Sequence, residues 1–238
     1  MSQDDFMKVF DWFKTVVTET TEQGGQKNLI DWKHEHTLRV LKWGEKIMEQ
    51  EKNIEWDYNL GKIVCLLHDI GRFPQSKYNT FNDKISINHA KVGGVMWKNR
   101  EMFRNNKIMA IIKEAIDEHN NPYYSGNNIY VKLVRDADQM TILSEYKKQI
   151  GFHEYDSGVM SEDIKKKFLS KKMISSQDNK TLGDWIATIL MWEEYFNFPS
   201  TKVFCRENRL NDKIIKEYLD HCQKNKLEVE KEFKKKSN

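Results

Sequence analysis

Apolar residues recur every three to four positions along most of this chain, and this helical spacing most limits the folds open to it. The first such stripe comprises Phe6, Val9, Phe10, Phe13 and Val17. An α-helix places residues with this spacing on one face, so each stripe predicts a helix that buries that face. Only three prolines occur, and stretches of alternating β-branched residues are few, which disfavours a sheet. We therefore expect an all-α fold, a helical bundle.

The ends of the stripes set the expected helix boundaries. Gly24 and Gly25 are expected to end the first helix, and Asp57 to cap a later one. Further helices are expected over residues 29–50, 57–69, 85–99, 105–119, 128–149 and 211–235, with loops over 71–83 and 151–158. No internal repeat or low-complexity linker divides the chain. We expect a single domain over residues 1–238, with a core at about 30–145 and a helical extension at about 160–238.

Charge and hydropathy exclude several classes of protein. Lys and Arg number 39 against 36 Asp and Glu, a net charge of +3, so no overall basic surface for nucleic acid is expected. No stretch approaches the roughly 18 apolar residues that a membrane span needs, and the first ten residues lack the apolar core of a signal peptide. Three cysteines without Cys-x-x-Cys spacing fit a reducing compartment. We expect a cytoplasmic protein, with its oligomeric state left open.

One apolar helical segment ends in an adjacent histidine and aspartate. Residues 63–67 are mostly apolar, and His68 and Asp69 follow them directly. Burying either polar group without a partner costs several kcal/mol, and a divalent metal ion is a partner that both can bind. Imidazole together with carboxylate suits Mn, Fe, Co, Ni or Zn. The pair therefore predicts a transition-metal site at the end of a buried helix.

Four further histidines and aspartates lie on, or at the ends of, apolar helical stretches or beside small residues. These are His36, His89, His119 and Asp138. Gly93 and Gly94 follow His89, which would let another part of the backbone approach closely. Solvated histidines and aspartates more often lie on the polar face of a helix. We expect the four to join His68 and Asp69 in one site.

The order of these residues resembles the HD-domain superfamily of metal-dependent phosphohydrolases. The segments that carry the resemblance are HDIGR, HAKVGG, EHNNPYYSGN and RDADQM, within about residues 30–145. Residues two apart on a helix point to different faces, so His34 and His36 cannot easily bind one ion together. The resemblance implies that His36 is the ligand, because the residues after it, 38–41, match the family's pattern. It likewise implies that Asp138 is the ligand, while Asp136 orients a neighbour or holds Arg135.

The resemblance leaves two forms of the metal centre open. A single ion would need four ligands only, namely His36, His68, Asp69 and Asp138. In dinuclear members His89 and His119 would supply a second ion, with Asp69 bridging the two; otherwise these two histidines would bind phosphate. We favour two ions. A third ion is not expected, because Trp32 stands where a glutamate would be needed.

The expected reaction is hydrolysis of a phosphoester or phosphoanhydride bond by metal-activated water. The substrate would be a nucleotide or another small phosphorylated metabolite. Asp69 would hold the attacking water, while Arg72 and Arg39 would neutralise charge on the phosphate. An ion pair with Asp136, Asp138 or a helix terminus is an equal alternative for Arg39. The candidates for binding substrate are Lys77, Tyr123 and Tyr124.

Other functions remain open beside hydrolysis. Dinuclear iron oxygenases of the same superfamily use the same six ligands. A nucleotide sensor without turnover is disfavoured by the intact His68 and Asp69, and a purely structural helical protein would need six coincidental ligand positions. Cyclic di-GMP is disfavoured as a substrate, because SGNNIY stands where the GYP motif would lie. Guanosine tetraphosphate stays open, although the region around Asp138 lacks the Arg-Leu-His-Asn run typical of its hydrolases.

Overall fold

The structure, a computed structural model, describes residues 1–147 and 155–236. Within these residues the regular secondary structure is helical, apart from one isolated β-bridge between Gly158 and Val229. This confirms the expected all-α fold. The chain forms two compact units, Met1–Asp138 and Gln139–Asn238, and the boundary falls inside helix α7. The expectation of a single domain over residues 1–238 stays a prediction.

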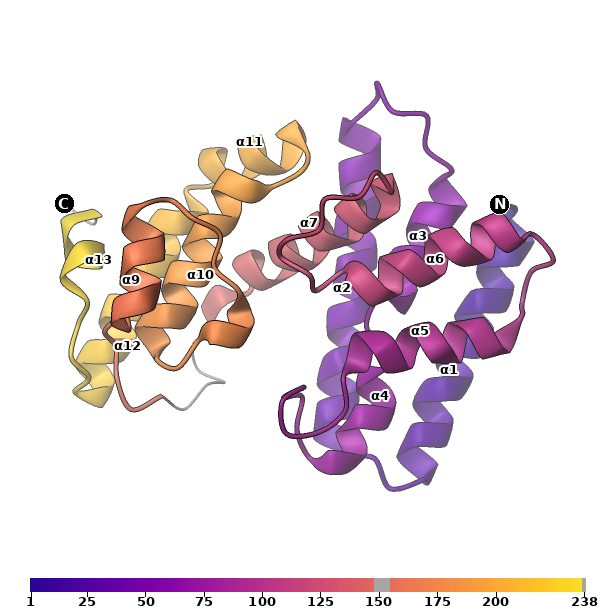
Figure 1. The fold of residues 1–238 in the computed structure, drawn as a ribbon, viewed down its shortest axis with the longest axis horizontal. Coiled ribbons are helices and arrows are strands. Elements are labelled where there is room, and N and C mark those ends of the chain that lie inside the picture. Colours follow the sequence, from indigo (N-terminus) through magenta and orange to yellow (C-terminus); the bar gives the residue numbers. More distant parts are fainter. Residues whose placement is uncertain (148–154, 237–238) are drawn as a thin grey trace. The chain divides into compact units, whose positions relative to one another are not determined.

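The first unit carries all six predicted metal ligands. Its helices, α1 to α7, are labelled in Figure 1. Its elements are α1 (Gln3–Glu22), α2 (Lys27–Gln50), α3 (Tyr58–Leu67), α4 (Arg72–Gln75), η1 (Ser76–Tyr78), α5 (His89–Arg100), α6 (Asn106–Glu118) and the start of α7 (Ile129–Ser144). In α3 the side chains from Ile63 to Leu67 are fully buried. A helix that is apolar on all sides needs neighbours to cover it, and α1, α2 and α6 all pack against α3. The end of α3 therefore lies inside the unit, which is where His68 and Asp69 follow.

Capping residues explain where two of these helices begin. Asp57 accepts a hydrogen bond from the backbone N–H of Leu60 at 3.0 Å, which makes it the N-cap of α3 as expected. Asn105 caps α6 in the same way, accepting from the N–H of Lys107 and Ile108. These caps satisfy N–H groups that a helix start leaves without intrahelical partners.

Two expected boundaries near the predicted site are wrong. The expected loop over residues 71–83 contains helix α4 and the 3-10 helix η1. Pro74 is tolerated in α4 because it lies in the first turn, where its missing N–H has no intrahelical partner to lose. The expected helix over 85–99 begins only at His89, because the side chain of Asn88 accepts from the N–H of Lys91 and caps α5 there. His89 thus starts a helix and does not lie in its middle.

The second unit is also helical. Its described elements are the end of α7, α9 (Glu162–Leu169), η2 (Ser176–Asp178), α10 (Leu182–Tyr195), α11 (Pro199–Glu207), α12 (Leu210–Asn225) and α13 (Lys231–Lys236). Residues Leu182–Met191 of α10 are buried without a break and form the core of the unit. The expected helix over 211–235 is wrong in one respect: it breaks at Lys226, whose left-handed backbone (φ 56°) ends α12. The expected loop over 151–158 and the end of the expected helix over 128–149 lie partly outside the described residues.

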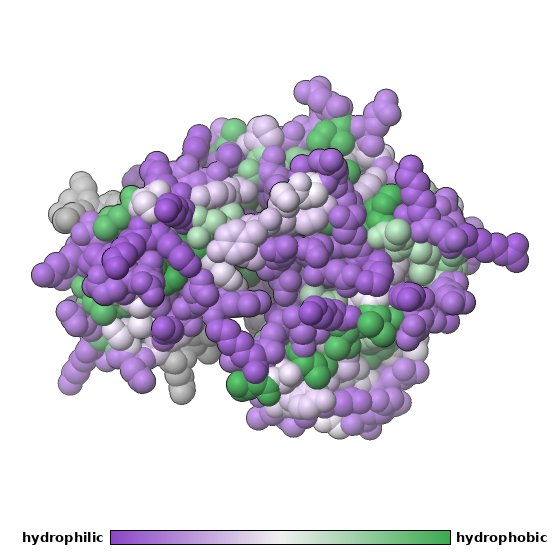
Figure 2. All heavy atoms as spheres, viewed as in Figure 1, coloured by the Kyte–Doolittle hydropathy of each residue, from purple (hydrophilic) through white to green (hydrophobic). Residues whose placement is uncertain are grey.

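The surface in the view of Figure 2 is mostly hydrophilic. Hydrophilic residues cover most of the visible face, and apolar residues form small separate groups (Figure 2). None of the helices in the described part of the chain is long and apolar enough to cross a membrane.

Candidate metal centre

The six residues predicted as ligands come together inside the first unit. His36 lies on α2, His68 and Asp69 directly after α3, His89 at the start of α5, His119 at the end of α6 and Asp138 on α7. Five of them are buried, with exposed fractions of 6% or less, and the side chain of Asp138 is 23% exposed. Four helices and the turn after α3 thus contribute to one buried cluster, which we call the histidine cluster.

Two of the histidines are oriented by the ends of their own helices. His68 and His119 are the C-cap residues of α3 and α6. The Nδ1 atom of His68 lies 2.8 Å from the carbonyl of Cys65, and that of His119 lies 2.7 Å from the carbonyl of Ile116. A carbonyl oxygen can only accept, so each Nδ1 carries a hydrogen, and in the neutral form of each ring Nε2 has the lone pair. Carbonyls that a helix end leaves unpaired therefore direct both Nε2 atoms into the cluster.

His89 is oriented by a carboxylate from the preceding loop. Its Nδ1 lies 2.7 Å from Oδ2 of Asp83 and 2.9 Å from Oδ1. Asp83 is held in turn by Arg72, whose guanidinium donates at 2.9 Å, and by the amide of Gln75 at 2.9 Å. This chain of contacts fixes the tautomer of His89 and points its Nε2 into the cluster. Carboxylates behind a ligating histidine have this effect at known metal sites.

Asp69 lies between two pairs of histidines. Its Oδ2 atom is 3.1 Å from Nε2 of His68 and 4.0 Å from Nε2 of His36. Its Oδ1 atom is 3.2 Å from Nε2 of His89 and 3.4 Å from Nε2 of His119. Each oxygen of one carboxylate thus faces its own pair of imidazole nitrogens. The two triads that share Asp69 each place three potential ligand atoms within 4.8 Å of one another.

Asp138 completes the first of these triads. Its Oδ1 atom lies 2.9 Å from Nε2 of His36. Asp136 is fully buried beside it, and the neighbouring Arg135 donates to the carbonyl of Pro122 at 3.2 Å. Asp138, the aspartate that the resemblance selected, therefore contacts a histidine of the cluster.

Several buried atoms of the cluster fit a metal ion. Within the described residues, Nε2 of His36, Nε2 of His68, Oδ1 of Asp69 and Oδ1 of Asp138 make no hydrogen bond of acceptable geometry. Buried polar atoms without partners are costly, and four of them converge here. Imidazole nitrogens and carboxylate oxygens are the donor set of first-row divalent metals. The residues present therefore fit such an ion.

The protonation states of His36 and His89 favour the same interpretation. Burial and the nearby ammonium of Lys33 lower the pKa of His36 to about 4. Burial and the nearby guanidinium of Arg72 lower the pKa of His89 to about 4 as well. Both rings are therefore neutral at pH 7, which is the form that binds metal. For His68 burial lowers the pKa, but the adjacent charge of Asp69 outweighs burial and raises it.

The two aspartates of the cluster are ionised. Burial would raise the pKa of Asp69, but Lys33 and His68 outweigh burial and hold that pKa well below the ordinary value. Burial would likewise raise the pKa of Asp138, but the contact with His36 lowers it. Both carboxylates are charged at neutral pH, so the cluster offers the negative charge that a divalent cation requires.

A buried lysine also belongs to the cluster, and the sequence interpretation missed it. Nζ of Lys33 lies 2.6 Å from Oδ2 of Asp69, and the lysine side chain is only 7% exposed. The one sequence signal for it is spacing, since Lys33 lies one helical turn before His36 on the same face of α2. Asp83 was missed too, because it lies in a loop where helical periodicity gives no information.

The structure brings Arg72 to the cluster. Its Nε atom lies 3.5 Å from Oδ1 of Asp69, and its NH1 atom also donates to the carbonyl of Phe81 at 2.6 Å. The other predicted arginine, Arg39, pairs at 3.3 Å with Glu35, one turn earlier on α2. The roles of both arginines stay predictions.

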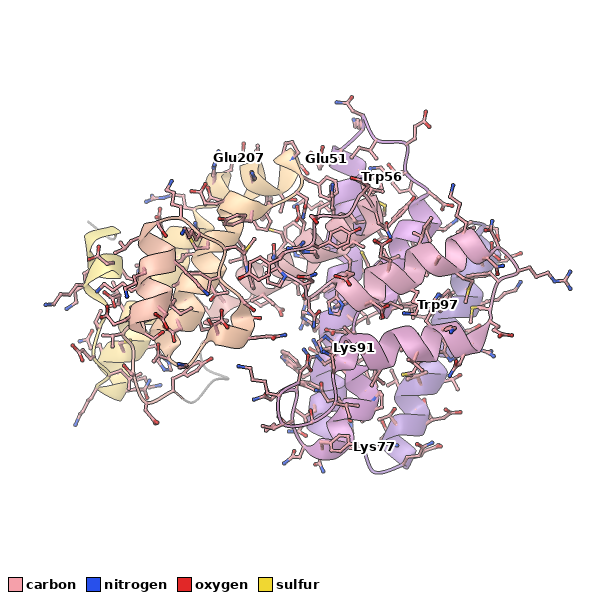
Figure 3. The ribbon with its side chains drawn as sticks, viewed as in Figure 1. Glu51, Trp56, Lys77, Lys91, Trp97 and Glu207 are labelled. Carbon is pink, nitrogen blue, oxygen red and sulfur yellow. The ribbon has the colours of Figure 1, made fainter. Side chains whose placement is uncertain are left out.

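The three predicted substrate-binding residues make their contacts elsewhere in the first unit. Lys77 (labelled in Figure 3) donates at 2.7 Å to Gln23, which lies in the loop between α1 and α2. The hydroxyl of Tyr124 donates to Glu114 at 2.8 Å. Tyr123 is 61% exposed in the loop after α6. Their substrate roles also stay predictions.

His34 points away from the cluster. Its ring stacks on Phe13 of α1, with ring centroids 5.7 Å apart. The opposite directions of His34 and His36 follow from their spacing of two residues on one helix.

Gly71 allows α5 to reach the turn that carries Asp69. A Cβ atom at Gly71 would lie 2.0 Å from the carbonyl oxygen of His89 and 2.8 Å from the backbone nitrogen of Gly93. Only a residue without a side chain fits there. The close approach that the glycines after His89 suggested is therefore present, and it places His89 against Asp69.

Comparison with known proteins agrees with this arrangement. The HD domain family model matches residues 34–143, a segment that includes all six residues of the histidine cluster. Residues 34–143 are therefore similar to an HD domain, as the resemblance in the sequence implied. Neither a curated protein nor a solved structure gives a significant match to the chain.

Proposed function

We propose that this protein is a metal-dependent phosphohydrolase that acts on a nucleotide or another small phosphorylated metabolite. The observation that carries the proposal is the position of Asp69, which presents one oxygen to His36 and His68 and the other to His89 and His119. A carboxylate placed between two histidine pairs suits a site for two neighbouring cations. The HD domain supports the reaction class, because the superfamily consists largely of such hydrolases.

The proposed first ion would be held by four residues, His36, His68, Asp69 and Asp138. A second would be held by His89 and His119, with Asp69 shared. Manganese, iron, cobalt, nickel and zinc all accept this donor set. When bound, such ions activate water as a nucleophile and offset the charge of a phosphoryl group.

The protein's own groups would prepare the site for this chemistry. Asp69 is ionised and buried, so it is suited to hold both cations and to orient a water molecule beside them. Arg72 lies next to Asp69 and carries a positive charge toward the same space. Positive charge at that position would stabilise the negative oxygens of a phosphoryl group. Arg39 is kept as a second candidate for this role.

Two experiments in sequence test the function. Elemental analysis of the purified protein should find a transition metal, at close to two ions per chain. A screen for phosphate release over nucleotides and small phosphate esters should then find a substrate whose turnover is lost on chelation and regained on adding metal. A protein that binds no transition metal and gains no activity from one would contradict the proposal.

The same experiments separate the alternatives. An iron oxygenase using the same six ligands would take up iron selectively and consume oxygen without releasing phosphate. A sensor would bind a nucleotide with metal present and leave it intact. Either result would replace hydrolysis as the function.

A further inference from the structure

Lys33 is a buried cation with a single acidic partner. Its ammonium pairs with Oδ2 of Asp69 at 2.6 Å and with no other carboxylate among the described residues. A buried lysine is stable only while its charge is compensated. The stability of this ammonium therefore depends on one carboxylate oxygen.

That oxygen is also a predicted metal ligand. The Oδ2 atom of Asp69 faces Nε2 of His68 at 3.1 Å and Nε2 of His36 at 4.0 Å, the other atoms of the first triad. A cation bound among these atoms would take the place that the ammonium of Lys33 now occupies at Oδ2. Two adjacent cations repel each other strongly in a buried site. Metal binding and the Lys33–Asp69 ion pair should therefore exclude each other.

Arg72 differs from Lys33 in this respect. Its guanidinium pairs with Asp83 at 2.9 Å and donates to the carbonyl of Phe81 and to the side chain of Gln75. These contacts do not involve Asp69, so they persist when a metal ion takes both oxygens of that carboxylate. Arg72 stays anchored, whereas Lys33 loses the one carboxylate with which it pairs in the described part of the chain.

Two aromatic rings surround the ammonium of Lys33. Nζ lies 4.8 Å from the ring centroid of Trp32 and 5.9 Å from that of Phe81. Both rings are partly exposed, so this side of the histidine cluster is the side nearer to solvent. Aromatic faces stabilise a cation that has lost its ion pair. A released ammonium would remain beside the cluster, between these two rings.

We propose that Lys33 is a substrate-binding residue that is released by metal. Without metal its ammonium neutralises Asp69, and with metal it binds the phosphoryl oxygens of the substrate. This inference rests on the proposed function, since it assigns a ligand to the same site. It names a cation that the resemblance to HD domains did not imply.

Metal affinity gives the first test, and it does not depend on activity. Lys33→Met removes the charge and keeps the length of the side chain. The Kd for Mn²⁺, measured by calorimetry on chelator-treated protein, should fall by about tenfold or more, because a competing buried charge is gone. Without metal the variant should unfold at a lower temperature than the wild type, because the charge of Asp69 is left unpaired. Added Mn²⁺ should then raise its unfolding temperature by more than it raises that of the wild type.

Phosphate affinity gives the second test. In Mn²⁺-loaded protein, Lys33→Met should weaken the binding of inorganic phosphate by roughly 10- to 100-fold, the range expected for one charge-assisted hydrogen bond. Lys33→Arg should recover part of the affinity, because it restores the charge. Lys27→Met is the matched control, since Lys27 lies on the same helix in an exposed pair with Asp31. The control should change neither Mn²⁺ nor phosphate binding.

The outcomes separate this inference from the proposed function. If the wild type hydrolyses a phosphate ester with metal but Lys33→Met binds Mn²⁺ and phosphate as the wild type does, the role of Lys33 is wrong and the function stands. If Lys33→Met shows both shifts but the wild type hydrolyses no phosphate ester, the function is wrong and Lys33 belongs to an anion-binding site. If Lys33→Met binds Mn²⁺ more weakly than the wild type, Lys33 supports the fold of the site and the competition with metal is refuted. A wild type that binds no metal would overturn both.

Discussion

Asp83 accepts a hydrogen bond from Nδ1 of His89 at 2.7 Å, and this contact ties the loop before α5 to the histidine cluster. His68 and His119 are oriented by carbonyls of their own helices, but His89 begins its helix and has no such carbonyl behind it. The loop supplies the missing acceptor. Burial would raise the pKa of Asp83, yet the contact with His89 and the charge of Arg72 lower it to about 2, so the acceptor stays ionised at neutral pH.

Replacing Asp83 should therefore weaken metal binding without removing a ligand. In Asp83→Asn the negative charge behind His89 is lost, and we expect the affinity for the second ion to fall by roughly 10- to 100-fold, as at other sites that lose such a carboxylate. Calorimetry with Mn²⁺ measures this. Asp31→Asn, at an exposed position on α2, is the control and should bind metal as the wild type does. Unchanged affinity in Asp83→Asn would show that the contact only holds the loop.

The two neighbouring histidines of α2 should behave differently. His36→Ala removes a predicted ligand, so metal content should fall and turnover should be abolished. His34→Ala removes only a ring that stacks on Phe13, so metal content should persist and the rate should change by a few-fold at most, about 1 kcal/mol. Metal analysis and initial rates on both variants decide the matter. Equal losses would mean that the assignment of faces on α2 is wrong.

Gly71 gives a test of the backbone contact that positions His89. A Cβ atom there would lie 2.0 Å from a backbone carbonyl, which cannot move aside as a flexible side chain would. Gly71→Ala should lower the free energy of unfolding by about 3 kcal/mol or more and displace α5 from Asp69. Urea unfolding measures the loss, and metal content should fall with it.

The control for Gly71→Ala is Gly24→Ala. Gly24 has a positive φ of 86° but no atom within 4 Å of a Cβ placed there. Its substitution should cost only about 1 kcal/mol, through backbone strain alone. A loss at Gly71 no larger than that at Gly24 would show that α5 can shift without harm.

Much of the histidine cluster could be predicted from the sequence, because four of its six residues stand on or at the ends of helices with regular apolar faces. Periodicity then fixes which side chains point inward, as it does for His36 against His34. Lys33 and Asp83 could not be found in this way. Lys33 joins the cluster through its contact with Asp69, 36 positions further along the chain, and Asp83 lies in a loop whose residues contact Arg72 and Gln75. The same contacts explain why the residues around Pro74 form a short helix where a loop was expected.

Acid should destabilise the protein when metal is absent. The folded pKa of His36 and that of His89 lie at about 4 against 6.5 in the unfolded chain, so the unfolded state binds more protons between these values. Stability must then fall as the pH drops from 6.5 toward 4, by up to about 3 kcal/mol for each histidine. His68 affects stability in the opposite sense, because its pKa is raised in the folded protein. The stability that it adds is fully present below about pH 6.5 and is lost as the pH rises above that value.

Urea unfolding of chelator-treated protein at pH 7, 6 and 5 measures this dependence. The free energy of unfolding should decrease at each step, and His89→Gln should make the decrease about half as steep. The lowered pKa values of the aspartates do not contribute in this range, since the stability they confer is lost only below about pH 4. Stability that is constant or higher at pH 5 would show that the two rings are protonated in the folded protein.

Two variants distinguish whether Asp69 binds two ions or only one. Asp69→Asn keeps the shape of the side chain but removes the charge that would hold two cations together, so both ions should bind more weakly. Turnover should then fall by a factor of about 10³ or more, on the order of 4 kcal/mol. His89→Ala removes a ligand of the proposed second ion only, and it should keep about one ion per chain. Metal per chain, measured by elemental analysis of both variants after the same loading and dialysis, tests the difference. If His89→Ala retains full metal and full rate, the centre holds one ion and His89 serves to pack α5 against the end of α3.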